Sequence, residues 1–167
     1  MKKEKPKYLG LLLATANAEK SKDFYANVLQ QKIVCDHFSE HLDLEGFSLN
    51  ADFDKLLEGK WASQPIKSKV DKTKPNNFQL YFEVDDLDYW VAKLKATEGI
   101  EMIHDIVEYT YGQRVSHFYD PDGHVVELSE SFETAAKRLM AQGLSIEQVA
   151  ERFGDSVEIV KQLLENE

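Results

Sequence analysis

The sequence predicts an α+β fold in which one strand–helix–strands pattern occurs twice and a small all-helical tail follows. Three observations support this prediction. Residues 8–58 and 77–130 show the same order of apolar strands and amphipathic helix. A turn with the sequence Asp-Pro-Asp-Gly-His lies at residues 120–124, near the end of the second copy. Residues 131–167 show helical spacing of apolar residues alone. A chain of 167 residues can bury one core and carry a short appendage. We therefore expect a two-copy domain over residues 1–130 and a helical tail over 131–167.

The first copy begins with an apolar strand at residues 8–14. A helix is expected over residues 19–30, because Phe24, Val28 and Leu29 recur at helical spacing. Short apolar stretches then predict three strands, at residues 32–38, 41–44 and 47–50.

The second copy follows residues 59–76, which contain prolines and lysines and are expected to form a linker. Asp85 or Asp86 caps its helix, and Gly99 follows the helix where a left-handed residue is often needed. Placing Asn17 on Asp86, an offset of 69 residues, aligns strand with strand and helix with helix. The apolar stripe of the helix is Leu87, Trp90, Val91 and Leu94, and strands are expected at residues 78–84, 101–108, 114–119 and 124–129.

The turn at residues 120–124 separates two strand-forming stretches. Pro121 restricts φ at the second turn position, and Gly123 supplies the freedom to close the turn. Glu127 then interrupts an apolar strand. Because a buried carboxylate needs a partner, Glu127 is expected either on the solvent face of a plain hairpin or at the floor of a site.

Several short motifs occur in a fixed order: Glu19-Lys20-Ser21, Phe24-Tyr25 with Val28-Leu29, FEVDDLD at 82–88, YGQRV at 111–115 and DPDGHVVEL at 120–128. Together they resemble the vicinal oxygen chelate superfamily, which includes glyoxalase I, bleomycin-resistance proteins, fosfomycin-resistance thiol transferases and extradiol dioxygenases. The resemblance covers residues 8–130. It implies two βαβββ modules, at about 8–58 and 77–130, whose strands form a curved mixed sheet around an open cup. It also implies a homodimer.

The resemblance further assigns positions for metal ligands, on the first and last strand of each module. These positions fall on Gly10 in the first module and on Gln79 and Glu127 in the second, while the fourth has no acidic candidate. Glycine has no ligand atom, and a catalytic metal generally has about three protein ligands. We therefore expect no metal cofactor, with a divalent metal at Gln79 and Glu127 as the alternative. A further alternative is that these two side chains bond to each other or to a ligand.

Other side chains are candidates for binding a ligand in the cup. Tyr81 shares a strand face with Gln79, His117 matches a substrate-contacting position of the thiol transferases, and Tyr111 and Arg114 lie in a segment that resembles a ligand-closing loop. Three of them also have a structural alternative: Tyr81 as a core tyrosine, His117 as a surface histidine and Arg114 as a solvated arginine. The predicted binding set is Gln79, Tyr81, Tyr111, Arg114, His117 and Glu127. The catalytic residues are left unassigned.

Composition excludes several classes of partner. The chain has 20 basic and 30 acidic residues, a net charge of −10, which disfavours nucleic acid and anionic membrane surfaces. No apolar stretch is long enough to cross a membrane. Cys35 is the single cysteine, so no intrachain disulfide can form, and a cytoplasmic location is expected. Neighbouring Asp36 disfavours a nucleophilic thiol, and no ligand spacing is evident at His37, His41, His104 or His124.

The tail predicts three short helices. Gly143 and Gly154 end the first two, and capping boxes are expected at Ser145 with Gln148 and at residues 155–158. Residues 143–154 resemble the first half of a helix-turn-helix, but the tail has seven acids against four bases. DNA binding is therefore disfavoured, and a docking or dimer-stabilising appendage is preferred. The apolar stripe is expected to contain Leu139, Met140, Leu144, Val149, Phe153, Val160 and Leu163.

Three functions follow from these observations. The preferred one is a bleomycin-resistance-like protein that binds a flat or cationic small molecule without a tightly bound metal. The first alternative is a metal-dependent enzyme, either a lyase similar to lactoylglutathione lyase (glyoxalase I), a transferase similar to the fosfomycin-resistance proteins, or a dioxygenase-type member. The second alternative is a ligand-sensing regulator that uses its helical tail.

Overall fold

The protein is described by a computed structural model, which covers residue 8 and residues 10–37, 41–51 and 78–165. The chain divides into two compact units. The first comprises Met1–Lys74 with the turn Pro121–Gly123, and the second comprises Pro75–Asp120 and His124–Glu167. The tail thus groups with the second copy of the pattern. The expected linker at residues 59–76 lies outside the described residues.

The first unit contains a mixed four-stranded sheet in the order β1-β4-β3-β2. β1 pairs parallel with β4, and the other neighbours pair antiparallel. Tyr25, Leu42 and Leu49 are buried in its core, where the Tyr25 ring packs edge-on against Phe47. The elements are β1 (Leu11–Ala14), α1 (Ala18–Asp23), η1 (Phe24–Val28), β2 (Ile33–His37), β3 (His41–Leu44) and β4 (Phe47–Asn50).

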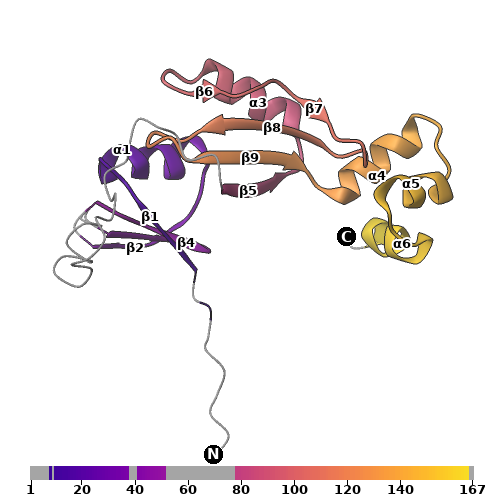
Figure 1. Cartoon of the computed structure of the whole chain (residues 1–167), viewed down its shortest axis with the longest axis horizontal. Coiled ribbons are helices and arrows are strands. Elements are labelled where there is room, and N and C mark those ends of the chain that lie inside the picture. The colour runs from indigo at the N-terminus through magenta and orange to yellow at the C-terminus, as the bar shows by residue number, and fades with distance from the viewer. Residues whose placement is uncertain (1–7, 9, 38–40, 52–77, 166–167) are drawn as a thin grey trace, which may run out of the picture. The chain divides into compact units, whose positions relative to one another are not determined.

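The second unit repeats this topology with the order β5-β9-β8-β6, and β7 also pairs with β8. β5 pairs parallel with β9, and β9 lies between β5 and β8 (Figure 1). Of the four predicted stripe residues, Leu87, Val91 and Leu94 are buried on one face of the helix, and Trp90 is half-buried. The elements are β5 (Gln79–Val84), α3 (Leu87–Ala96), β6 (Glu101–Met102), β7 (Val107–Glu108), β8 (Arg114–Tyr119) and β9 (Val125–Glu130).

The two helices begin at equivalent positions. Asn17 accepts a hydrogen bond from the backbone N–H of Lys20, and Asp86 accepts one from that of Tyr89. Both are N-caps, and they are separated by the 69 residues that align the two copies. The predicted α+β fold of two repeated modules with a helical appendage is confirmed.

Two expected elements are interrupted. The helix predicted over residues 19–30 changes from α to π winding at Phe24 and ends before Gln30, whose φ is +56°. The strand predicted over 101–108 splits into β6 and β7, because the Asp105 carboxylate accepts a hydrogen bond from the Ile106 N–H and forms a local turn. This interruption places His104 in a turn between the two short strands.

The turn at residues 120–124 is held by its own acidic side chains. Asp120 Oδ1 accepts from the backbone N–H of His124 at 2.8 Å, and Asp120 Oδ2 lies 2.9 Å from His124 Nδ1. Asp122 accepts from the Ala16 N–H at 2.8 Å and the Ser21 hydroxyl at 2.7 Å. Both aspartates and the histidine of the turn motif therefore have structural contacts.

The tail forms three helices, α4 (Phe132–Ala141), α5 (Ile146–Phe153) and α6 (Val157–Glu165). Ser145 and Gln148 form the predicted capping box. The second predicted box is wrong: Ser156, not Asp155, accepts from the Ile159 N–H, and a hydrophobic residue at that position cannot reciprocate. Met140, assigned to the apolar stripe, is exposed. The buried core of the tail is Ala136, Leu139, Val149, Ala150 and Val160.

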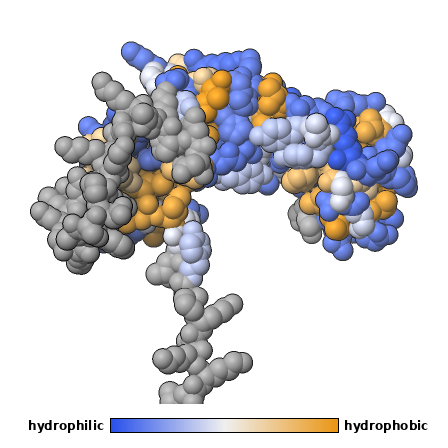
Figure 2. Space-filling model, viewed as in Figure 1, coloured by the Kyte–Doolittle hydropathy of each residue, from blue (hydrophilic) through white to orange (hydrophobic). Residues whose placement is uncertain are grey.

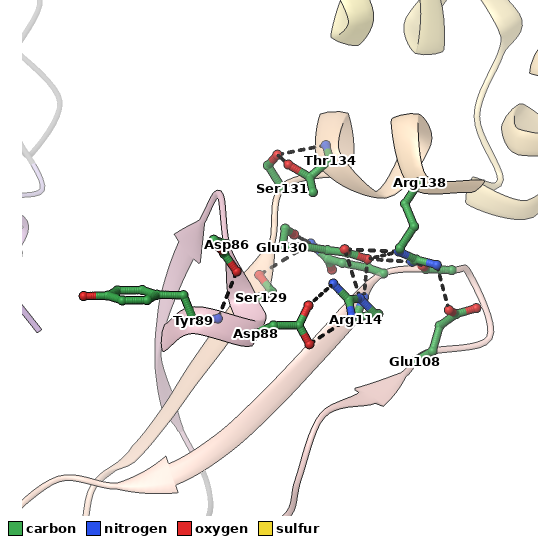
Figure 3. Close-up of polar contacts among 12 residues, drawn as sticks. Asp86, Asp88, Tyr89, Glu108, Arg114, Ser129, Glu130, Ser131, Thr134 and Arg138 are labelled. Carbon is green, nitrogen blue, oxygen red and sulfur yellow. Dashed lines mark hydrogen bonds and ion pairs between the residues drawn. The ribbon is translucent and has the colours of Figure 1, made fainter. Parts of the chain in front are cut away.

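The tail is joined to the second unit through a buried carboxylate, that of Glu130, which is 0% exposed. Arg138 of α4 donates to Glu130 Oε1 at 2.6 Å and to the Gly112 carbonyl at 2.5 Å (Figure 3). Arg114 donates to Glu130 from its backbone N–H at 2.9 Å. Arg138 and Arg152 also pair with Glu108. In Figure 2 the visible face of the tail mixes hydrophobic with hydrophilic side chains.

Candidate functional site

Three polar side chains converge on the sheet of the second unit. Gln79 lies on β5, and the central pair is formed by Glu127 on β9 and His117 on β8, which are directly opposite each other in the strand register. Gln79 Nε2 donates to Glu127 Oε2 at 2.6 Å, and His117 Nε2 lies 2.8 Å from Glu127 Oε2 and 3.1 Å from Gln79 Oε1. The expected convergence of these residues is present, while their role in binding a ligand stays a prediction.

His104 joins this cluster, and sequence reasoning missed it. Its Nε2 lies 2.8 Å from His117 Nδ1, and its Nδ1 lies 2.6 Å from the carbonyl oxygen of Asp105. The two imidazole rings are 4.9 Å apart. The backbone N–H of Ile103 donates to the His117 carbonyl at 2.9 Å, and this pairing places His104 next to His117. No sequence spacing reveals such a cross-strand neighbour.

The tautomers of the two histidines are coupled through their mutual hydrogen bond. If His104 Nδ1–H donates to the Asp105 carbonyl, its Nε2 accepts from His117 Nδ1–H. In this arrangement the contact between His117 Nε2 and Glu127 Oε2 becomes a hydrogen bond when His117 also carries a proton on Nε2. The cluster therefore links two histidines and a buried carboxylate in one chain of contacts.

The environment of His117 favours its neutral form. Burial lowers the pKa of His117 below the ordinary 6.5, and the neighbouring His104 lowers it further, while the carboxylate of Glu127 acts in the opposite direction. Glu127 is 5% exposed. Burial raises the pKa of Tyr109, and the negative charge of Glu127 adds to this effect. The field of this carboxylate therefore extends to the loop after β7.

A cavity of about 510 Å³ opens beside the cluster. This volume lies within the range of about 300–1,000 Å³ that is usual for small-molecule sites. Its wall combines aromatic and aliphatic surface with polar groups of the cluster. It is lined by Phe78, Gln79, Ile103, His104, His117, Tyr119 and Val125.

Glu127 contacts the lining residues Gln79 and His117 but does not itself line this cavity, and neither do three other predicted ligand-binding residues. Tyr81 donates its hydroxyl to Glu83 at 2.8 Å. The Tyr111 ring is stacked on Phe132 of the tail, with centroids 6.1 Å apart. Arg114 is neither solvated nor directed at the cavity, because it pairs with Asp88 at 3.0 Å and with Glu130 at 3.2 Å. These contacts give Tyr111 and Arg114 structural roles in this arrangement.

The family resemblance assigns four positions to metal ligands, and only two of them carry side chains suited to bind a metal. Gly10 has φ +146°, and a Cβ there would lie 3.1 Å from the Gly46 carbonyl oxygen, so the backbone disfavours any side chain. Ser48 occupies the first-unit position equivalent to Glu127, because Ser48 pairs with Leu12 as Glu127 pairs with Tyr81. A hydroxyl is a weak ligand compared with a carboxylate. The four family positions therefore do not fit a tightly held divalent ion.

Comparisons with known proteins agree with this architecture. Residues 8–133 match the family described as a glyoxalase-like domain. A protein of unknown function from Agrobacterium tumefaciens str. C58 is 30% identical, with a TM-score of 0.62 over 77% of this chain and 96% of that chain. No curated protein matches.

Two further solved structures are more distant in sequence. A glyoxalase/bleomycin resistance protein/dioxygenase from Nocardioides is 20% identical, with a TM-score of 0.56, and covers 77% of this chain and 85% of its own. A genomically encoded fosfomycin resistance protein from Listeria monocytogenes is 17% identical, with a TM-score of 0.55, over 77% and 95% of the two chains. At these identities, the similarity establishes a common fold.

Proposed function

We propose, because this chain belongs to the glyoxalase-like domain family, that its second unit binds a small molecule without a tightly bound metal at that site. The observation that carries the proposal is the cavity of about 510 Å³ whose wall includes Gln79, His104 and His117. The mutual bonding of Gln79, His117 and Glu127 holds these polar groups in a defined orientation. Such preorganised polar groups beside apolar surface are typical of ligand sites.

The lining favours a flat organic cation. Aromatic side chains and imidazoles supply surface for stacking, and Glu127 supplies a negative charge within the same cluster. The net charge of −10 for the whole chain favours the approach of a cation over that of an anion. Ethidium, a planar fluorescent cation, is therefore a suitable first probe.

Ethidium should bind the full-length protein with an increase in its fluorescence. Glu127→Gln should weaken this binding about tenfold, equivalent to about 1.4 kcal/mol, because the charge is removed while the hydrogen-bonding shape is retained. The control Glu98→Gln makes the same charge change at an exposed residue and should leave the affinity unchanged. Equal affinities for the wild type and Glu127→Gln would show that the cation binds elsewhere.

Binding of this probe should also depend on pH. The pKa of His117 is depressed below 6.5, so above that pH the histidine is neutral and the charge of Glu127 is uncompensated. As the pH falls through the pKa of His117, the imidazolium that forms compensates this charge, and cation affinity should decrease. Fluorescence titrations at a series of pH values measure the effect. An affinity that rises on acidification would contradict the assignment of the charge to this pair.

Metal analysis separates this function from a metal-dependent lyase or transferase. A stoichiometric divalent metal that survives dialysis in the wild type and is absent from Gln79→Ala and Glu127→Ala would overturn the metal-free proposal. The proposal also includes a homodimer and a cytoplasmic location. Among the described residues, no helix is long and apolar enough to cross a membrane.

A further inference from the structure

We propose that the β2–β3 hairpin of the first unit binds a zinc ion through Cys35, His37 and Asp43. This site is separate from the cluster around Glu127, and it does not depend on the proposed function of the second unit. Ligand atoms of the three side chains lie within 4.8 Å of one another. The chain offers no other thiol, since Cys35 is its single cysteine.

Strand pairing explains this convergence. Cys35 is opposite Asp43 in the register, and His37 is opposite His41. Because residues two apart on a strand share a face, all four side chains lie on one face of the two-stranded ribbon. His37 Nε2 already lies 3.5 Å from Asp43 Oδ2. Zinc bonds of about 2.0–2.3 Å would require only small side-chain movements to close the site.

His41 is a further candidate ligand on the same face, outside the group of three. Its Nε2 lies 3.0 Å from Asp43 Oδ1, and its ring centroid is 5.6 Å from that of His37. A histidine that binds a metal through Nε2 donates its Nδ1–H to a second group. The side-chain amide of Asn50 lies beside this ring, with its Nδ2 3.2 Å from His41 Nδ1.

The side chain of Asn50 supports His41 from the neighbouring strand. It is 7% exposed, and its Oδ1 is a buried acceptor with no hydrogen-bond partner among the described residues. Rotation of the amide would bring Oδ1 to His41 Nδ1, which satisfies the acceptor and frees the lone pair of His41 Nε2. In this orientation the Asn50 amide would hold His41 with its Nε2 available to a metal.

The donor types select the kind of metal. One thiolate, imidazole nitrogens and one carboxylate suit zinc, whereas calcium and magnesium prefer oxygen ligands. Ser48 donates to Asp43 Oδ1 at 2.6 Å and holds the carboxylate in place. The side chains of His37 and Asp43 are 55% and 35% exposed, so the ion should exchange with solvent rather than resist dialysis.

Metal titration of the full-length protein tests this site. After treatment with chelator and dialysis under reducing conditions, calorimetry should show one zinc ion bound per chain. Cobalt should give a thiolate-to-metal charge-transfer absorption band that is lost in Cys35→Ser. His37→Ala and Asp43→Asn should each weaken zinc binding at least tenfold, about 1.4 kcal/mol or more. Circular dichroism verifies folding, with Cys35→Ala as the replacement if Cys35→Ser unfolds.

Matched variants give the experiment its specificity. Asp36→Asn changes a carboxylate on the same strand but on its opposite face, where Asp36 pairs with Lys22, and should retain zinc. Glu127→Gln should also retain it, because the second-unit cluster is not involved. Zinc affinity that is unchanged in Cys35→Ser and Asp43→Asn, or that is lost in Glu127→Gln, would overturn the proposal, as would the absence of zinc binding by the wild type.

Discussion

Arg138→Met should lower the free energy of unfolding by roughly 3–5 kcal/mol, because it leaves the buried carboxylate of Glu130 with half of its ion-pair partners. Glu130 is 0% exposed and accepts hydrogen bonds from Arg138 at 2.6 Å and from Arg114 Nε at 3.2 Å (Figure 3). The same substitution removes the donor to the Gly112 carbonyl. The retained Arg114 places the expected loss toward the lower end of this range.

Urea unfolding followed by circular dichroism measures this loss. Lys137→Met is the matched control on the same helix, because Lys137 and Glu133 form a pair whose side chains are 54% and 35% exposed. Removing such a surface pair should cost less than about 0.5 kcal/mol. The double variant Arg138→Met with Glu130→Gln should recover part of the stability, because the unpaired charge is gone. A single variant as stable as the control would show that the carboxylate is hydrated.

The repeated fold could be predicted because its signals are local and occur twice. Asn17 and Asp86 cap helices at equivalent positions, and the predicted strands at 41–44, 47–50 and 114–119 match β3, β4 and β8 at both ends. The family resemblance, read from short motifs, is likewise confirmed by the match over residues 8–133.

Breaks within elements were not predictable from periodicity. The winding change at Phe24 leaves the apolar spacing nearly unaltered, so residues 19–30 still read as one helix. The break at Asp105 depends on whether a side chain competes with the strand for the Ile106 N–H. Both outcomes are decided by tertiary packing and by local hydrogen bonds.

The residues of the candidate site likewise include some that the sequence could predict and some that it could not. Gln79, His117 and Glu127 follow from matching the chain to a family pattern, and the structure brings them together. His104 could not be found, because it reaches His117 through a turn created by the break at Asp105. The register of β2 and β3 includes an irregularity between Ile33 and Cys35, so the grouping of Cys35 with Asp43 was also beyond sequence reading.

Attachment of the tail depends on a glycine that sequence analysis treated only as part of a motif. Gly112 has φ +99°, and a Cβ at this position would lie 3.0 Å from Leu139 Cδ1 and 3.2 Å from Arg152 Nε. Leu139 is fully buried in the core of the tail. The absence of a side chain at Gly112 therefore permits the close approach of α4 and α5 to the loop before β8.

Gly112→Ala should destabilise the protein for two reasons. The left-handed backbone disfavours a Cβ by about 1–2 kcal/mol, and overpacking against the buried Leu139 adds roughly 1–3 kcal/mol. Gly99→Ala is the matched control, because Gly99 has φ +83° and no atom within 4 Å of its added Cβ. Gly99→Ala should therefore show only the cost of the left-handed backbone. The difference in free energy of unfolding between the two variants then measures the cost of the contact with the tail.

Urea unfolding of both variants, combined with limited proteolysis of the tail, measures this difference. Gly112→Ala should unfold at a lower urea concentration than Gly99→Ala and should be cleaved faster between residues 131 and 165, because the added methyl group pushes α4 and α5 away from the second unit. Equal stabilities with equal protection of the tail would mean that Leu139 moves aside without cost. In that event Arg138, which donates to both Glu130 and the Gly112 carbonyl, would carry the attachment of the tail.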